Sequence, residues 1–217
     1  AAGREGPVVQ IGAAVASSIG RGLGFGGNDL VALVGCGAAA GISASFGAPI
    51  AGAMFALEVI LGELHVGSFA PAVIASVVAA VTGKALRGPG EEFAHPGYSL
   101  GSGFELLPYA LLGVLCGGLA IAYIQTGRLL ESAFARGLLG RIAPALRPAL
   151  GGLAVGAIGL AAPEALGVGV EPMNRALLGE MTAGALAAAG LAKLAATGLT
   201  LGSGGSGGSL FPALFIG

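Results

Sequence analysis

Long stretches without charged side chains constrain the fold of this chain more than any other feature. Residues 106–123 contain no charged residue, and residues 68–86 contain a single lysine. As helices rising about 1.5 Å per residue, both can cross a hydrocarbon core of roughly 30 Å. Charged residues make up 10% of the chain, against roughly 25% in a soluble domain, and the mean hydropathy is +0.90. The sequence therefore predicts an all-α, polytopic membrane protein.

Other apolar segments are shorter and are interrupted by glycine and proline. The segment after Pro7 ends near Ile19, so it is too short to cross a bilayer and is expected to be a half-span. Asn28 and Asp29 are good N-cap residues for a second segment, and Pro49 suits the first turn of a third. The further segments expected are 7–19, 28–46, 49–61, 151–161 and 177–201, with a Pro/Gly loop at 163–172. This pattern predicts broken and half-spanning helices.

The composition also excludes several kinds of partner. Glycine accounts for 43 of the 217 residues, which favours helices packed closely through small side chains. The formal charge of -1 provides no basic surface for nucleic acid, and aromatic residues are too few for a base-stacking platform. Cys36 and Cys116 stand alone in apolar surroundings, which predicts packing instead of metal binding. We therefore expect no nucleic acid partner and no metal.

A cluster of arginines indicates the orientation in the membrane. The region 127–148 holds Arg128, Arg136, Arg141 and Arg147 against the single acid Glu131. Because positively charged loops stay on the cytoplasmic side, this region is expected to be cytoplasmic. We expect an integral, multi-pass protein of the plasma (inner) membrane.

The two ends of the chain are imperfect copies of each other. Residues 3–12 and 208–217 carry Gly, Pro, Ile and Gly at the same places, with proline starting an apolar run in each. Such a pattern is typical of a helix N-terminus, whose first backbone N–H groups lack intrahelical partners and attract anions. Matching interrupted segments in two halves of a membrane chain indicate a transport site where the helix ends meet near the bilayer midplane.

The glycine-rich run 202–208 allows two other interpretations. It contains a GxGxxG match, which invites a dinucleotide-binding site, but the segment before it is alanine-rich instead of strand-like. A flexible linker is the second alternative, although an apolar run follows directly. An unwound stretch that lets backbone amides approach an ion suits both the glycines and their location.

Three motifs together resemble the CLC family of chloride channels and chloride/proton antiporters. They are GREGP at 3–7, AAAGISASFGAPIAGAMFALE at 38–58 and GSGGSGGSLFP at 202–212. The resemblance covers the whole chain and implies the central part of the family's transmembrane domain. It implies an inverted repeat, with residues 1–86 ending the first half and 104–217 beginning the second. It also implies a homodimer, for which the small-residue region 47–83 is the expected interface.

The resemblance implies a function and a set of site residues. Glu5 falls on the family's gating glutamate, whose protonation links proton movement to chloride movement. The backbone amides of Glu5, Gly6, Ser209, Leu210 and Phe211 would bind the anion. Chloride and protons are then the transported ions, with no cofactor and no enzymatic activity. From the residues alone, Glu5 has two open roles: it competes with an anion for the helix end, or it only favours that positive end beside Arg4.

Glu58, Val59 and Lys193 leave further alternatives open. Glu58 is ionisable within an apolar segment, so it is a candidate for an accessory proton pathway, or a structural residue at a helix end. In many antiporters of the family a carboxylate follows this glutamate, whereas Val59 resembles the channels. Lys193 is expected to extend to the membrane interface, or else to attract anions to an inner vestibule. We expect a proton-coupled chloride antiporter, with a passive gated channel as the alternative and a non-transporting helical scaffold as a remote one.

Overall fold

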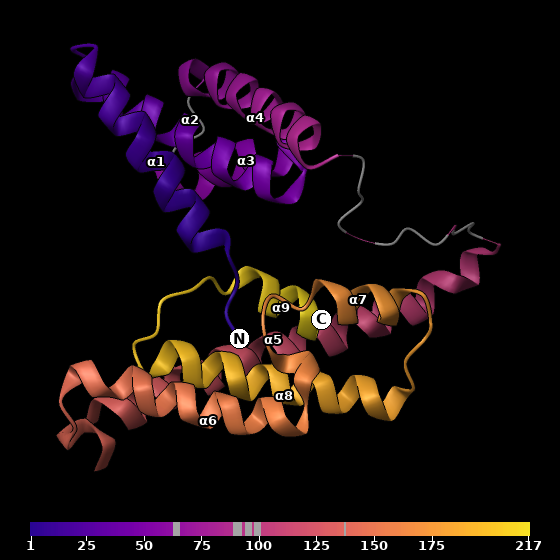
Figure 1. Cartoon of the computed structure of the whole chain (residues 1–217). Coiled ribbons are helices and arrows are strands. Elements are labelled where there is room, and N and C mark those ends of the chain that lie inside the picture. The colour runs from indigo at the N-terminus through magenta and orange to yellow at the C-terminus, as the bar shows by residue number, and fades with distance from the viewer. Residues whose placement is uncertain (63–65, 89–92, 94–96, 98–100, 137) are drawn as a thin grey trace. The chain divides into compact units, whose positions relative to one another are not determined.

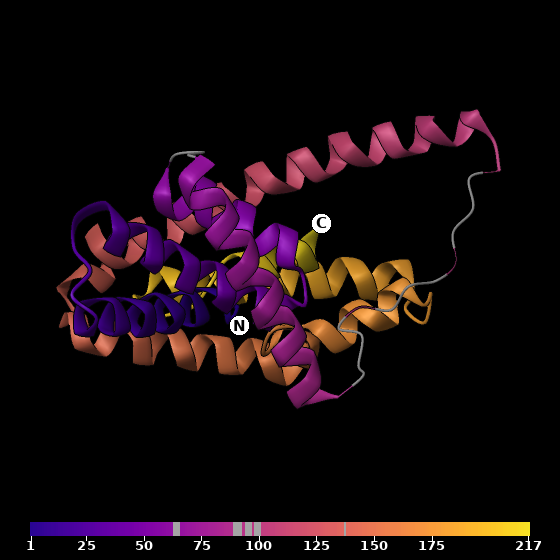
Figure 2. The same ribbon diagram turned by 90° about the horizontal axis from the view of Figure 1, so that it is seen from above.

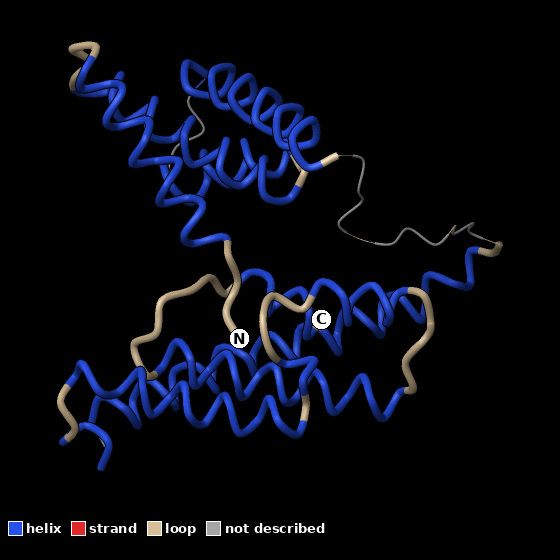
Figure 3. Tube along the Cα trace, viewed as in Figure 1, coloured by secondary structure: helices blue, strands red, loops and turns tan. Residues whose placement is uncertain are grey.

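The described part of the chain is helical throughout its named elements. A computed structural model describes residues 1–62, 66–88, 93, 97, 101–136 and 138–217. Every element within these residues is a helix (Figure 3), which confirms the all-α prediction. The chain divides into two compact units, an N-terminal unit Arg4–Glu92 and a C-terminal unit Phe93–Gly217 that includes Ala1–Gly3. The assignment of 1–86 and 104–217 to two inverted repeats stays a prediction.

The described residues of the N-terminal unit form four α-helices and a π-helix. They are α1 (Glu5–Gly22), α2 (Gly27–Phe46), α3 (Pro49–Phe55), the π-helix Ala56–Leu61 and α4 (Val66–Arg87). The four α-helices are labelled in Figure 1. The expected cap of α2 is wrong, because Gly26 occupies the N-cap position with an extended backbone and no side chain caps the helix. Asn28 and Asp29 lie in its first turn instead. α1 also continues past Ile19 to Gly22.

In the C-terminal unit, the part of the chain that the structure describes forms five α-helices. They are α5 (Leu106–Arg136), whose long course is visible in Figure 2, α6 (Arg147–Ala161), α7 (Val170–Leu177), α8 (Ala183–Gly202) and α9 (Leu210–Ile216). The segment expected at 177–201 is found as α8, but its expected start at Leu177 is wrong. Leu177 ends α7, Gly179 turns the chain with φ +74°, and Thr182 caps α8 by accepting a hydrogen bond from the Ala185 N–H at 3.3 Å.

Five helices among the described residues are long and apolar enough to cross a membrane. They are Gly27–Phe46, Gly67–Arg87, Gly103–Arg136, Pro144–Ala161 and Ala183–Gly202. The most apolar 18-residue window of α5 has none of its residues buried within the chain, and Leu107 and Val114 are among its exposed side chains. An apolar helix surface without protein cover is what a lipid environment favours. These helices agree with the polytopic membrane fold that the composition predicts.

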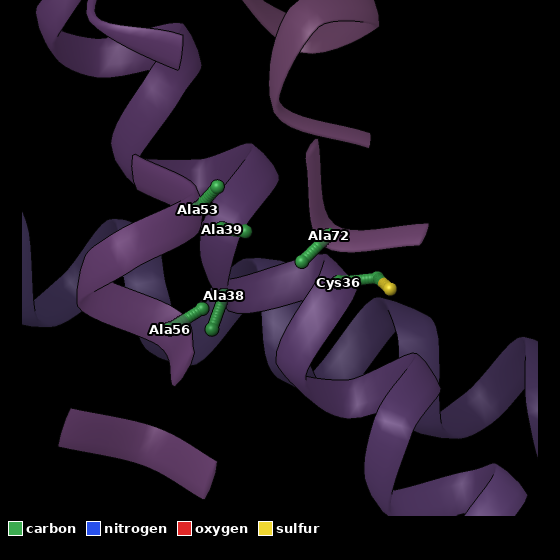
Figure 4. Close-up of a cluster of buried hydrophobic side chains, with 6 residues drawn as sticks. All are labelled: Cys36, Ala38, Ala39, Ala53, Ala56 and Ala72. Atoms are coloured by element: carbon green, nitrogen blue, oxygen red, sulfur yellow. The ribbon is translucent and has the colours of Figure 1, made fainter. Parts of the chain in front are cut away.

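Small side chains form the core of the N-terminal unit. Figure 4 shows the cluster, which consists of Cys36, Ala38, Ala39, Ala53, Ala56 and Ala72 from α2, α3, the π-helix and α4. Where α1 meets α2, a Cβ atom added to Gly12 would collide with the carbonyl oxygen of Gly37, and one added to Gly37 would collide with that of Gly12. The two helices therefore pack backbone against backbone, as the glycine content predicts.

This close approach makes Gly12 a sensitive position. We expect Gly12→Ala to destabilise the full-length protein by about 3 kcal/mol, because the new methyl group meets rigid backbone and must push α1 away from α2. Gly22→Ala is the matched control in the same helix, since nothing lies within 4 Å of its added Cβ atom. Thermal unfolding in detergent measures both variants. Equal melting temperatures for the two would contradict backbone packing at Gly12.

Candidate functional site

The first copy of the matched motif forms the N-terminus of α1. Arg4 is the N-cap residue, with φ -90° and ψ -7°, and the Val8 N–H donates to the Arg4 carbonyl at 3.1 Å. The amides of Glu5 and Gly6 therefore precede the first hydrogen bond of the helix. The Glu5 residue is buried, with 6% of its surface exposed. A negative charge there lies at the positive end of the helix.

Two arginines cap the end of α2 beside this motif. The Arg4 guanidinium donates to the Ser45 carbonyl at 3.1 Å, and the Arg87 guanidinium donates to the same oxygen at 3.5 Å and to the Ala44 carbonyl. Cations are favourable at the C-terminus of a helix, where the last carbonyls lack intrahelical donors. Arg4 thus makes a structural hydrogen bond, and it ties the start of α1 to the end of α2.

The second copy forms the N-terminus of α9 with the same local geometry. Ser209 is the N-cap residue, with φ -103° and ψ -12°, and the Ala213 N–H donates to the Ser209 carbonyl at 3.1 Å. Phe211 is fully buried and its ring lies 6.4 Å from that of Phe93, whereas Leu210 is 41% exposed. The Tyr123 hydroxyl also donates to the Ser209 carbonyl at 3.2 Å. The amides of Ser209, Leu210 and Phe211 therefore precede the first hydrogen bond of α9.

The glycine-rich run before α9 is unwound, as predicted. α8 ends at Gly202, and no helix covers residues 203–209. The dinucleotide interpretation fails because the element before the run is the helix α8 and not a strand. A solvent-exposed linker is equally inconsistent, because Ser203 and Gly208 are buried. The Ser203 hydroxyl donates to the Thr200 carbonyl at 3.1 Å, which anchors the start of the run.

A pair of hydrogen bonds joins the residues that open the two copies. The Gly3 N–H donates to the Gly208 carbonyl and the Gly208 N–H donates to the Gly3 carbonyl, each at 2.8 Å. Both glycines are buried and both belong to the C-terminal unit. The Thr197 hydroxyl secures the same segment by donating to the Ala1 carbonyl at 2.9 Å. Sequence reasoning did not predict this bridge, although the alignment of 3–12 with 208–217 already matches Gly3 to Gly208.

Glu58 and Val59 lie together in the π-helix Ala56–Leu61. Both residues are exposed at the surface of the N-terminal unit, Val59 to 60%. A π-helix is rare and is often found at functional sites. The accessory proton role of Glu58 stays a prediction.

Lys193 lies where the sequence did not place it. The expectation that it extends to the membrane interface is wrong, because the residue is fully buried. Its ammonium group donates to the Ala165 carbonyl at 3.3 Å and to the Gly167 carbonyl at 2.7 Å, and it lies 5.2 Å from the centre of the Phe215 ring. Nothing in the local pattern around Lys193 reveals these partners, because they come from two other segments.

Metal binding has no support among the residues that the structure describes. No group of three or more His, Cys, Asp or Glu side chains there could hold a metal ion.

A family model described as voltage gated chloride channel matches residues 1–217. The chain belongs to the CLC family. It is 37% identical to a putative chloride channel protein ClcB-like of Ralstonia nicotianae, over 99% of this chain and 50% of that protein. It is 34% identical to the chloride channel protein CLC-f of Arabidopsis thaliana, over 99% of this chain and 29% of that protein.

A solved structure supports the same fold. The crystal structure of a CLC-type fluoride/proton antiporter matches with a TM-score of 0.82 and 26% identity, over 100% of this chain and 54% of that one. The predicted CLC fold is therefore confirmed, and with it an integral, multi-pass membrane protein. The family consists of channels and transporters, not enzymes. This chain spans half or less of the length of the curated relatives named here.

Proposed function

We propose that the full-length CLC protein transports chloride or similar small anions across a membrane, coupled to protons through Glu5. The observation that carries the proposal is the Gly3–Gly208 bridge. α1 begins at Glu5 and α9 begins at Leu210, each two residues beyond a bridge glycine. Both helix starts therefore follow directly on the bridge in the sequence.

Helix N-termini of this kind suit a small, weakly held anion. The proposed ligands are the backbone amides of Glu5, Gly6, Ser209, Leu210 and Phe211. Each helix end contributes partial positive charge without a fixed cation, so the potential attracts the ion without trapping it. Conduction requires this balance between entering and leaving a site. Chloride is the cargo, and the site needs no cofactor.

Glu5 is the proposed gate and proton carrier. Its carboxylate is an anion at the start of α1, where it can compete with chloride for the same positive helix end. Protonation removes the charge of the carboxylate and so weakens its attraction to the positive end of α1. The burial of Glu5 supports this role. If the Glu5 side chain and the anion exchange places, both must occupy the same buried position in turn. The role of a purely structural carboxylate predicts no link between protons and chloride.

A passive, gated chloride channel is the second candidate, and Val59 favours it. A valine cannot carry a proton, and it stands next to Glu58 where many family antiporters have a carboxylate. Under this alternative Glu5 still gates the pore, but no proton crosses with each transport cycle. We further propose a homodimer assembled through the region 47–83 and a location in the plasma (inner) membrane.

Flux measurements on the full-length protein in liposomes test the proposal. An imposed chloride gradient is expected to drive protons in the opposite direction, even against a pH gradient, because one site exchanges the two ions. A pH dye inside the liposomes reports the protons, and a chloride electrode reports the anion. Chloride movement without proton movement would favour the channel. If the protein shows no flux and no saturable halide binding by calorimetry, only the helical scaffold alternative remains.

A further inference from the structure

Lys193 is a fully buried cation that the proposed transport mechanism does not use. It is one of two lysines in the chain and lies in the middle of α8, inside the C-terminal unit. An ionisable side chain inside a membrane-spanning helix is costly, so a functional role is the first hypothesis. The question is whether it contacts the transported anion or acts through its neighbours.

The contacts of the Lys193 ammonium group answer this question. A lysine has three N–H donors, and two of them are used by the Ala165 and Gly167 carbonyls. The ring of Phe215, centred 5.2 Å away, takes a place where the cation interacts favourably with the face of an aromatic residue. Within the described residues no carboxylate pairs with it. Protein groups therefore surround the ammonium group, which leaves it poorly placed to act as a ligand of the anion.

These contacts join three segments of the C-terminal unit. Lys193 comes from α8, Ala165 and Gly167 from the turn before α7, and Phe215 from the end of α9. Gly169 completes the cluster, since a Cβ atom added to it would lie 2.6 Å from the Phe215 ring and 3.4 Å from the Lys193 nitrogen. Its φ of +93° suits glycine and brings the turn close to the ring. The packing leaves no room for Phe215 to move toward the turn.

Contacts hold α9 at two places along its length. Its start is held by the bridge at Gly208 and by the Tyr123 hydroxyl on the Ser209 carbonyl. Near its end are the Lys193 contact with Phe215 and a weak bond from the Cys116 thiol to the Gly217 carbonyl at 3.6 Å. Without the contacts near Phe215, α9 would be held only at its start and could tilt about that point. Tilting would turn the first amides of α9 away from a bound anion.

We propose that Lys193 is a positioning residue, which fixes the direction of α9 through Phe215 and so holds the amides at its start in place. This inference rests on the proposed function, because it assumes that those amides bind chloride. Its consequence is that chloride affinity depends on a cation that does not touch the ion. Preorganised donors bind more tightly because less ordering is needed when the ligand arrives.

Chloride binding to the full-length protein in detergent, measured by calorimetry, tests the inference. Lys193→Met keeps the length of the side chain but removes its charge and donors, and we expect the dissociation constant for chloride to rise about tenfold. Lys193→Arg keeps both charge and donors and is expected to stay within about threefold of the wild type. Lys84→Met is the matched control, since Lys84 is the other lysine of the chain and is exposed. This substitution should leave the affinity for chloride unchanged.

A second variant separates positioning from loss of stability. Phe215→Leu removes the ring but keeps an apolar side chain, so it should weaken chloride binding in the same direction. If Lys193 acts through Phe215, the double variant Lys193→Met/Phe215→Leu will bind chloride as tightly as whichever single variant has the lower affinity. The reason is that the effects of substitutions at two contacting residues do not add. Size-exclusion chromatography identifies any variant that fails to fold, and Phe215→Leu alone then decides the outcome.

The possible results are distinct. Wild-type affinity in Lys193→Met or in Phe215→Leu would overturn the inference, and so would fully additive losses in the double variant. Failure of the wild-type protein to bind chloride would instead overturn the proposed function.

Discussion

Glu5→Gln in the full-length protein is expected to leave chloride flux intact while proton flux falls to background and the pH response of chloride flux disappears. Glutamine has nearly the shape of a protonated glutamate but cannot gain or lose a proton. The side chain would therefore stay in the uncharged state, in which it no longer competes with an anion for the positive end of α1. Chloride and proton fluxes in liposomes at several pH values measure the effect.

A matched substitution shows whether this effect belongs to Glu5. Glu171 also lies in the first turn of a helix, α7, but its residue is exposed. Glu171→Gln should retain both proton coupling and the pH response. If Glu5→Gln retains the wild-type pH response, Glu5 is not the gate. Its carboxylate would then be the structural group that the sequence left as the alternative.

Gly207→Ala is expected to reduce chloride affinity by roughly 10- to 100-fold, because small displacements of positioned groups have effects of this size. A Cβ atom added to Gly207 would collide with the Cβ atom of Ala2. An alanine methyl group cannot rotate away, so the backbone of one segment has to move. Ala2 and Gly207 immediately precede Gly3 and Gly208, whose mutual hydrogen bonds would be lost.

Gly26→Ala is the control for this loop substitution. Gly26 also lies outside a helix, with φ -145°, and nothing comes within 4 Å of its added Cβ atom. Halide titration of both variants by calorimetry measures the difference. Equal, wild-type affinity in Gly207→Ala would show that the bridge does not hold the anion site.

Features that depend on a few neighbouring residues could be predicted from the sequence. Pro7 follows the N-cap of α1 closely, Pro49 begins α3, and the glycines after Gly202 unwind the chain. Each of these residues restricts or frees its own backbone, so the effect is local. The all-α membrane fold was predictable for the same reason, because hydropathy needs no knowledge of distant contacts.

The failures involve competition between local signals or contacts across the chain. Asn28 and Asp29 are suitable caps, but Gly26, two residues before Asn28, takes the N-cap position. Gly179 divides an apolar region that hydropathy alone reads as continuous. The burial of Lys193 depends on carbonyls and a ring from other segments, which no pattern around Lys193 encodes. The bridge between Gly3 and Gly208 is of the same long-range kind.

The length of α5 has a consequence for the depth at which the C-terminal unit rests in the bilayer. Its 31 residues extend about 46 Å, some 16 Å more than a hydrocarbon layer of roughly 30 Å. All the charged side chains of this helix, Arg128, Glu131 and Arg136, fall in its last three turns. Headgroups and water are the only favourable surroundings for those turns. The helix therefore limits how deeply the C-terminal unit lies in the bilayer.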